Sequence, residues 1–398
     1  MTTTPPWLRA IDAAGLRDTD GTVRATIFAE MSALAAQHDA INLGQGYPDE
    51  DAPAPVAEAA IAAIRAGLNQ YPPGRGTPEL RRAVAEHRER FFGERRHPDT
   101  EVLITAGATE AIAAAMLALV DRGDDVVTLS PFYDAYAAMV GLTGARHVTI
   151  PLEGDDFQPT PQSIDAAIGP NTRVVLLNNP HNPTGSVIAP ELLERIVAAA
   201  ARHDAIIVSD EVYEHLVFDD APFTPIVSIP GAAERSLTIS SAAKTFRVTG
   251  WKVGWMTGPA HLIDAVMAVK QYLTYVNGAP FQPAVAVGLG LGDDYFDDQR
   301  RTLAARRDRL SAGLAAAGFA VSPSRGSYFV VADAAPLGVR DANRYARELT
   351  VERGVAAIPL AAFDPRSRDA RIRSSLRFAF CRTDAQIDEA VRRLTSGR

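Results

Sequence analysis

The sequence has almost no cysteine, little lysine and no long apolar run. Its 398 residues contain one cysteine, Cys381, so no disulfide can form within the chain, as is usual in a reducing cytoplasm. Cys381 follows the apolar residues Phe378–Phe380 and is interpreted as a core residue. No apolar stretch reaches the roughly 20 residues of a membrane span, and the N-terminus lacks the apolar segment of a secretory signal. We therefore expect a cytoplasmic protein without membrane contact.

The charge of the chain also excludes some partners. The formal net charge is -8, and no basic run is interleaved with aromatic residues, so we expect no nucleic-acid partner. Nearly all basic residues are arginine, and the only lysines are Lys244, Lys252 and Lys270. Arginine cannot replace lysine where a primary amine must lose its proton and attack a carbonyl. These three lysines are therefore the first candidates for such chemistry.

Short apolar runs alternate with helical patterns from about residue 100 to residue 260. The expected strands are Val102–Thr105, Asp125–Leu129, His147–Pro151, Arg173–Asn178, Ala205–Ser209 and Arg235–Ser240. Helical patterns fill the intervals, for example from Pro190 to His203. Such alternation is typical of an α/β fold, in which helices cover both faces of a mostly parallel sheet.

The sequence changes character after about residue 290. A long Arg-rich helical pattern, Tyr295–Ala317, is followed by short expected strands at Phe319–Val321, Ser327–Ala332, Val355–Ile358 and Ser374–Phe380. We expect a large domain over residues 48–290 and a smaller α+β domain over 291–398. Residues 1–47 are expected to be mostly irregular and to pack with the smaller domain. The polar segment Asp364–Arg373 is interpreted as a surface loop.

Residues with chemical potential follow several of the expected strands, where ligands of open α/β sheets bind. Gly107, Ala108 and Thr109 open a helix, whose N-terminus favours a phosphate, although ordinary helix capping uses the same residue types. Tyr133 follows another strand and either stacks on a planar ligand or packs in the core. A phosphorylated planar ligand would use both features.

The later strands are followed by more polar groups. Asn182 lies in a proline-rich turn, and Asp210 ends an apolar strand, where a carboxylate is costly unless it is paired or caps a helix. Tyr213 follows closely, and Lys244 lies among small residues, where burial lowers the pKa of an amine. Together these groups suit pyridoxal 5′-phosphate (PLP): donors for its ring oxygen, a carboxylate for its pyridine nitrogen and an amine for its aldehyde.

Rival motifs are absent from the sequence. No nucleotide phosphate loop occurs, and Gly288–Gly292 lies in a helical region rather than after a strand. His181 and His215 have no partner at a spacing typical of zinc sites, so no metal is expected. His181 is kept as an open candidate for a residue near the site.

The chain resembles the class I/II, fold-type I aminotransferases along nearly its whole length. The matching motifs are Asn42–Pro48, Gln70–Gly74, Asn179–Gly185, Asp210–Tyr213, Ser241–Lys244, Gly250–Gly254 and Leu376–Phe378. The resemblance implies the fold of PLP-dependent transferases and a homodimer.

The resemblance also implies a role for each site residue. Lys244 forms the Schiff base with the cofactor, Asp210 pairs with the pyridine nitrogen, Tyr133 stacks on the ring, and Asn182 and Tyr213 contact the ring hydroxyl. The residues implied to hold the phosphate are Ala108, Thr109, Ser241, Lys252 and, reaching across from the other subunit, Tyr71. The residues implied to lie against the substrate are Gly46, Asn182 and Arg377, of which Arg377 binds the α-carboxylate.

Within the family, the chain is most similar to kynurenine/glutamine and methionine transaminases, cysteine-conjugate β-lyases and actinobacterial N-succinyldiaminopimelate aminotransferases. Residues 271–283 are most like the last group, which implies transfer from N-succinyl-LL-2,6-diaminoheptanedioate to 2-oxoglutarate, a step of lysine biosynthesis. A broad-specificity transaminase, a β-lyase that uses the same Lys244, and a PLP-binding regulator remain alternatives. Arg75 is either a solvated loop residue or a contact for a distal carboxylate.

Overall fold

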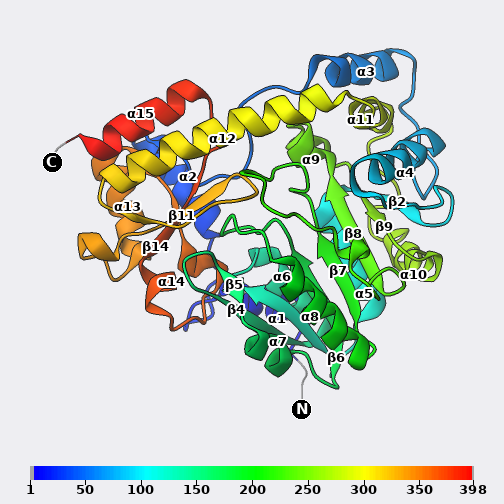
Figure 1. Ribbon diagram of the computed structural model, residues 1–398, viewed down its shortest axis with the longest axis horizontal. Helices are drawn as coiled ribbons and strands as arrows, with labels where there is room; N and C mark the ends of the chain where they lie inside the picture. The colour runs from blue at the N-terminus through cyan, green and yellow to red at the C-terminus, as the bar shows by residue number, and fades with distance from the viewer. Residues whose placement is uncertain (1–3, 397–398) are drawn as a thin grey trace.

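The computed structural model describes residues 4–396 and contains a large eight-stranded sheet (Figure 1). The strand order is β2-β9-β8-β7-β6-β3-β4-β5. The bounds are β2 Val102–Thr105, β3 Asp125–Ser130, β4 Arg146–Glu153, β5 Gln158–Pro159, β6 Thr172–Asn178, β7 Ile206–Asp210, β8 Ser236–Ser241 and β9 Gly254–Thr257. Five adjacent strands, β8-β7-β6-β3-β4, run parallel to one another, whereas β5 and β9 are antiparallel to their neighbours. The α/β class predicted from the sequence is confirmed.

Both faces of this sheet are buried. Neighbouring residues of a strand point to opposite faces, and on this sheet both sets belong to apolar clusters. Val126 and Leu176 belong to one apolar cluster, and Val127 and Leu177 to another. The helices of this part are α3 Ala54–Arg65, α4 Pro78–Phe92, α5 Gly107–Leu119, α6 Asp134–Thr143, α7 Pro161–Ala167, α8 Pro190–Arg202, α9 Ala242–Thr245, α10 Ala260–Lys270 and α11 Phe281–Leu289. The continuous apolar strands of the sequence are explained by this double coverage.

Strand β9 was not predicted from the sequence. It is short and lies between β2 and β8, antiparallel to both. Its first residue, Gly254, lies so close to the turn before α5 that a Cβ there would be 2.7 Å from the carbonyl carbon of Gly107. The strand therefore fixes the start of α5 at the carboxyl edge of the sheet.

A second sheet carries the C-terminal part of the chain. Its strands, β10 Ala320–Val321, β11 Phe329–Asp333, β14 Ser375–Ala379 and β13 Ile358–Pro359, form an antiparallel sheet in that order. The helices around it are α12 Asp293–Ala316, α13 Ala342–Arg353, α14 Ala370–Ser374 and α15 Asp384–Thr395. In Figure 1 the long helix α12 runs from this sheet towards α11. Helix α14 corrects the expectation that Asp364–Arg373 is only a loop.

The expected strand Val355–Ile358 is divided between two sheets. Its first half is β12, Val355–Ala356, which pairs in parallel with β1, Ile41–Asn42. Its second half begins β13, which pairs with β14. This short stretch therefore joins the segment before Gly44 to the sheet that carries Arg377.

The N-terminal segment is more regular than expected. It contains α1, Pro6–Ala13, and α2, Ile27–Gln37. Helix α1 packs on α6 beside the large sheet, whereas α2 packs against α13. The segment thus contacts both parts of the molecule. Helix α1 can begin at Pro6 because proline is tolerated in the first turn of a helix. Among residues 4–396, no helix combines the length and the apolar character needed to cross a membrane.

Candidate active site

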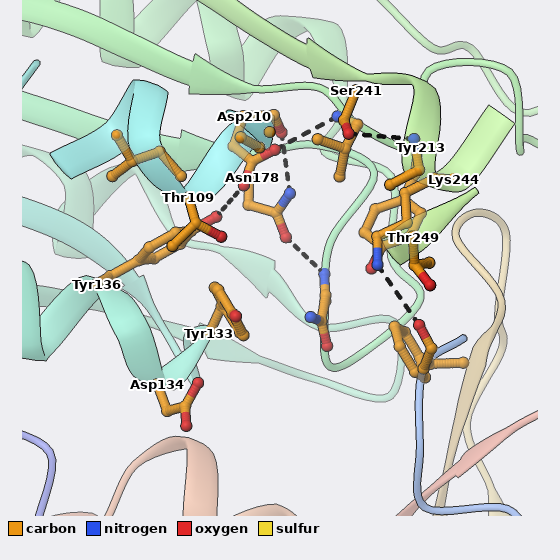
Figure 2. Close-up of a pocket in the computed structure, with 18 of the residues that line it drawn as sticks. Thr109, Tyr133, Asp134, Tyr136, Asn178, Asp210, Tyr213, Ser241, Lys244 and Thr249 are labelled. Carbon is orange, nitrogen blue, oxygen red and sulfur yellow. Dashed lines mark hydrogen bonds between the residues drawn. The ribbon is translucent and has the colours of Figure 1, made fainter. Parts of the chain in front are cut away.

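One cavity of about 350 Å³ lies at the carboxyl ends of the parallel strands (Figure 2). It contains every site residue predicted from the sequence except Tyr71. The predicted residues that line it are Gly46, Ala108, Thr109, Tyr133, Asn182, Asp210, Tyr213, Ser241, Lys244, Lys252 and Arg377. These residues come from both sheets, so the fold gathers them from distant parts of the sequence.

Asp210 is the last residue of β7, and its carboxylate is buried. The hydroxyl of Tyr136 donates to Oδ2 of Asp210 at 2.6 Å, and the side chain of Asn178 donates to the Asp210 carbonyl at 2.9 Å. Burial raises the pKa of Asp210 to about 6, although the bond from Tyr136 opposes this rise. A cation placed against this carboxylate would stabilise its charged form. The protonated pyridine nitrogen of PLP is such a cation.

Lys244 lies in the short helix α9, directly after β8. Ser241 caps this helix by accepting a hydrogen bond from the backbone of Ala243. The Lys244 Nζ lies 3.4 Å from the carbonyl oxygen of Gly46, and no carboxylate of the described residues forms an ion pair with it. Burial lowers the pKa of Lys244 because the charged ammonium is poorly solvated there. The site thus favours a neutral amine, which is the form that attacks a carbonyl.

Arg377, on β14, presents a guanidinium to the other side of the cavity. Its Nη1 donates to the side-chain oxygen of Asn182 at 2.8 Å, and its Nη2 donates to the carbonyl of Gly44 at 2.6 Å. The guanidinium lies 4.0 Å from the ring centre of Phe329, while its Nε is buried without a partner among the described residues. A planar cation that is held in this way and still has an unpaired donor suits a carboxylate.

The start of α5 forms a cradle for an anion. Gly107 has a φ of 75°, and a side chain there would meet the Nζ of Lys252 at 3.6 Å. Ala108 and Thr109 are the next residues of the helix, so their backbone N–H groups lie at its positive end. No ion pair neutralises Lys252 within residues 4–396. The free N–H groups and the amine fit a phosphate group.

Three sequence candidates lie outside the cavity of their own chain. Tyr71 is 81% exposed and touches the ring of Tyr275 edge-on. Arg75 forms an ion pair with Asp264, so within this chain it does not face the cavity. His181 is buried, its Nδ1 lies 2.7 Å from the Thr184 hydroxyl, and burial lowers its pKa to about 3.

The structure adds residues that the sequence did not indicate. Tyr136 and Asn178 hold Asp210, and Asp134 lines the cavity at the start of α6 (Figure 2). Burial raises the pKa of Asp134. The spacing from Tyr133 to Tyr136 is a signal that was available, because residues three apart lie on the same face of a helix.

A buried arginine lies behind the segment that carries Asp210. Arg88, on α4, contacts the carboxylates of Glu94 at 2.6 Å and Glu211 at 3.3 Å, and also pairs with Glu214. Glu211 follows Asp210 directly in the sequence. Arg88 therefore fixes the turn after β7 from the side opposite the cavity, which sequence spacing alone does not reveal.

Comparison with known proteins identifies the class. Residues 38–394 match the family of class I and II aminotransferases, so the chain belongs to that family. It is an enzyme with transaminase activity, and its cofactor is PLP. The predicted family, enzyme class and cofactor are thereby confirmed.

Individual relatives resemble nearly the whole chain. The probable N-succinyldiaminopimelate aminotransferase DapC of Mycobacterium tuberculosis is 51% identical over 378 residues, covering 93% of this chain and 95% of that protein. The methionine aminotransferase of Escherichia coli K12 is 36% identical over 93% of this chain and 95% of that protein. The solved structure of the M. tuberculosis N-succinyldiaminopimelate aminotransferase superposes with a TM-score of 0.91, covering 93% of this chain and 97% of that chain.

Proposed function

We propose that the protein transfers the amino group of N-succinyl-LL-2,6-diaminoheptanedioate to 2-oxoglutarate, as a step of lysine biosynthesis in the cytoplasm. The identity of 51% to the probable N-succinyldiaminopimelate aminotransferase, over almost the full length of both proteins, supports this donor. The lower identity of 36% to the methionine aminotransferase makes a broad-specificity enzyme the second candidate.

The arrangement of Lys244 and Asp210 in one cavity is the observation that supports the reaction. When bound, PLP supplies an electron sink for the electrons of the substrate Cα–H bond. Asp210 holds a proton on the pyridine nitrogen through its charge, and Tyr136 keeps that carboxylate in place. The neutral amine of Lys244 would take the proton from the substrate Cα and hold it at Nζ for transfer. In the structure this Nζ lies 3.4 Å from the carbonyl oxygen of Gly46.

The remaining site residues bind and orient the substrate and the cofactor. Arg377 and Asn182 hold the substrate α-carboxylate, which fixes the Cα–H bond relative to Lys244. Tyr133 covers the cofactor ring. The groups proposed to bind the cofactor oxygens are Ala108, Thr109, Ser241 and Lys252 for the phosphate and Tyr213 with Asn182 for the ring hydroxyl.

We also propose a homodimer in which Tyr71 completes the phosphate site of the partner subunit. Tyr71 is 81% exposed and its ring contacts that of the half-exposed Tyr275. Tyr272, three positions before Tyr275, is 84% exposed. Large aromatic side chains that are left exposed on a single chain are typical of an interface.

Single amino donors, added without an oxo-acid acceptor, test the substrate assignment. The bound cofactor changes its visible absorbance when it receives the amino group, and the rate of that change ranks the donors. We expect N-succinyldiaminopimelate to react faster than methionine, glutamine, kynurenine and glutamate. A faster reaction with methionine or kynurenine would replace the proposed donor. Release of pyruvate from a cysteine conjugate without acceptor would instead establish β-elimination.

The role of Lys244 has a separate test. Lys244→Ala should abolish turnover because the other amine of the cavity, Lys252, lies at the phosphate cradle beside Gly107. Thermal unfolding should stay cooperative. Lys270→Ala, at a lysine outside the cavity, is the matched control for loss of an amine. Substantial turnover by Lys244→Ala without added amines would overturn the assignment.

A further inference from the structure

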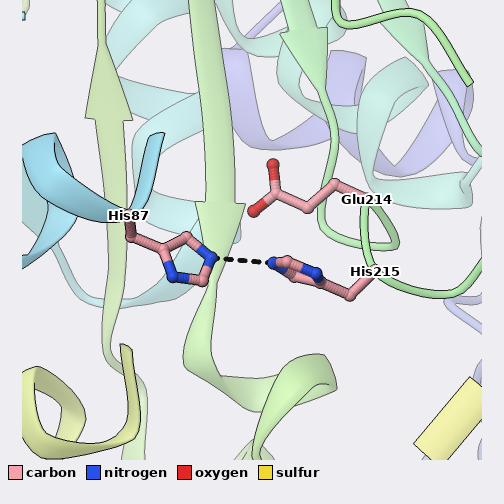
Figure 3. A group of neighbouring side chains, drawn as sticks. All are labelled: His87, Glu214 and His215. Carbon is pink, nitrogen blue, oxygen red and sulfur yellow. Dashed lines mark hydrogen bonds between the residues drawn. The ribbon is translucent and has the colours of Figure 1, made fainter. Parts of the chain in front are cut away.

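His87, His215 and Glu214 form a compact buried group outside the active-site cavity (Figure 3). One nitrogen of each ring and one carboxylate oxygen all lie within 4.8 Å of one another. The Nε2 atoms of the two histidines are 2.7 Å apart although 128 positions separate them in the sequence. That separation explains why the spacing of histidines in the sequence indicated no metal site.

The hydrogen bonds define which nitrogen carries a lone pair. The Nδ1 of His87 lies 3.1 Å from the backbone carbonyl of Leu289, so Nδ1 must donate. Nε2 of neutral His87 is then an acceptor, and the proton between the rings belongs to His215. A ring nitrogen fixed through a bond from the other nitrogen to a backbone carbonyl is the usual arrangement of a metal-binding histidine.

Glu214 supplies an oriented carboxylate. In Figure 3 one of its oxygens points towards the gap between the two rings. The hydroxyl of Ser240 donates to Oε1 at 2.8 Å, and Arg88 donates to Oε2. A carboxylate has about four acceptor positions, so both oxygens keep free lone pairs. Such outer hydrogen bonds hold a ligating carboxylate in place.

The local charge favours an added cation. The side chains of Glu94, Glu211 and Glu214 are buried around Arg88, and Arg96 also pairs with Glu94. Three buried carboxylates thus gather beside the two histidines. A divalent ion next to Glu214 would share that carboxylate with Arg88.

We propose that His87, His215 and Glu214 bind a divalent transition metal ion of the zinc type. Two imidazole nitrogens and one carboxylate oxygen suit Zn²⁺, Co²⁺ or Ni²⁺, whereas Ca²⁺ and Mg²⁺ require more oxygen ligands. The fourth position is left for water. For the metal to bind Nε2 of His215, the proton on this nitrogen must move to Nδ1, so the ring stays neutral and no net proton is released. Zn–N bonds of about 2.0–2.1 Å in tetrahedral geometry place the two nitrogens roughly 3.3 Å apart, so the rings must separate slightly.

An entrance to the group exists. His215 and Glu214 also line a surface cavity of about 610 Å³ together with Phe91, Phe92 and Phe223. An ion can reach the ligands from this side without passing the active-site cavity. The inference is thus independent of the proposed substrate.

Calorimetric titration of chelator-treated, PLP-loaded protein with Zn²⁺ tests the proposal. We expect one ion per chain. Crystals soaked in Zn²⁺ should give an anomalous peak between the three side chains. Absence of binding, or a peak elsewhere, would refute the site.

Variants separate this site from other surface binding. His87→Phe retains the packing against the rings of Phe91 and Phe296 and should abolish binding. Glu214→Gln, which keeps the histidine pair, should weaken binding by at least roughly tenfold. His147→Phe removes another histidine, half-buried and in contact with an aromatic ring, and should leave the stoichiometry at one. Wild-type affinity in both His87→Phe and Glu214→Gln would show that the ion binds elsewhere, and melting curves of each variant verify that it is folded.

Discussion

Removal of one hydroxyl, by Tyr136→Phe, should weaken the hold on the cofactor. The Tyr136 hydroxyl donates to Asp210 at 2.6 Å, and both side chains are buried. A hydrogen bond to a charged group contributes about 1.5–3 kcal/mol. Loss of this bond leaves a lone pair of the Asp210 carboxylate without a donor and makes its charged form less stable.

The expected changes follow from that energy. The pKa of Asp210, raised by burial to about 6, should rise further by roughly 1–2 units, at 1.36 kcal/mol per unit. Cofactor affinity requires the ionised carboxylate, so it is full above this pKa and falls as the pH drops through it. In the variant the midpoint of that fall should move to roughly pH 7–8. At pH 7 the ionised fraction of Asp210 falls from about 90% to roughly 10–50%, so the dissociation constant should increase roughly 2- to 10-fold.

Equilibrium titration of the apoenzyme with PLP, from pH 5 to pH 9, measures both quantities. Asp210→Asn provides the reference, because its affinity should no longer depend on this ionisation. Adding Tyr136→Phe to Asp210→Asn should have a much smaller effect than adding it to wild type. The reasoning is wrong if Tyr136→Phe leaves both the affinity and the midpoint of the wild type unchanged.

Three further substitutions test packing, charge and protonation. Gly254→Ala places a methyl group 2.7 Å from the Gly107 carbonyl carbon. It should lower the free energy of unfolding in urea by about 1–3 kcal/mol and weaken PLP binding. Gly250→Ala, where the space is open, should do neither. Arg88→Met leaves buried carboxylates unpaired and should lower the unfolding free energy by about 3–5 kcal/mol, and an unchanged value would contradict the pairing. Burial lowers the pKa of His147 to about 4, so the free energy of unfolding should fall as the pH drops from about 6.5 towards 4. His147→Phe should reduce this slope by about 1.4 kcal/mol per pH unit, and an unaltered slope would count against a neutral imidazole at this position.

The site residues at the carboxyl edge of the large sheet were predictable, because residues that follow neighbouring parallel strands lie close together at that edge. Asp210 and Lys244 each follow an apolar strand, and strands β7 and β8 are parallel neighbours in the structure. Their meeting in one cavity needs no information beyond the strand pattern. The rarity of lysine made Lys252 a candidate, and the family resemblance implied its place at the phosphate.

The remainder depended on contacts that no local pattern encodes. The pairing of His87 with His215 and the bonds of Arg88 join α4 to the turn after β7, far apart in the sequence. Strand β9 is four residues long, too short for alternation to be visible. Helix α1 was missed because its two leading prolines are also typical of irregular chain.

The division of residues 355–359 between two sheets has a consequence for the order in which the site forms during synthesis. Strand β14, which carries Arg377, follows every strand of the large sheet in the sequence, and Arg377 then bonds to Gly44 near the opposite end of the chain. On the ribosome, the lysine and the carboxylate of the large sheet can be in place while the substrate-anchoring arginine has not yet emerged. A nascent chain at that stage has no group to anchor an amino acid, so β14 must have been synthesised before the first turnover.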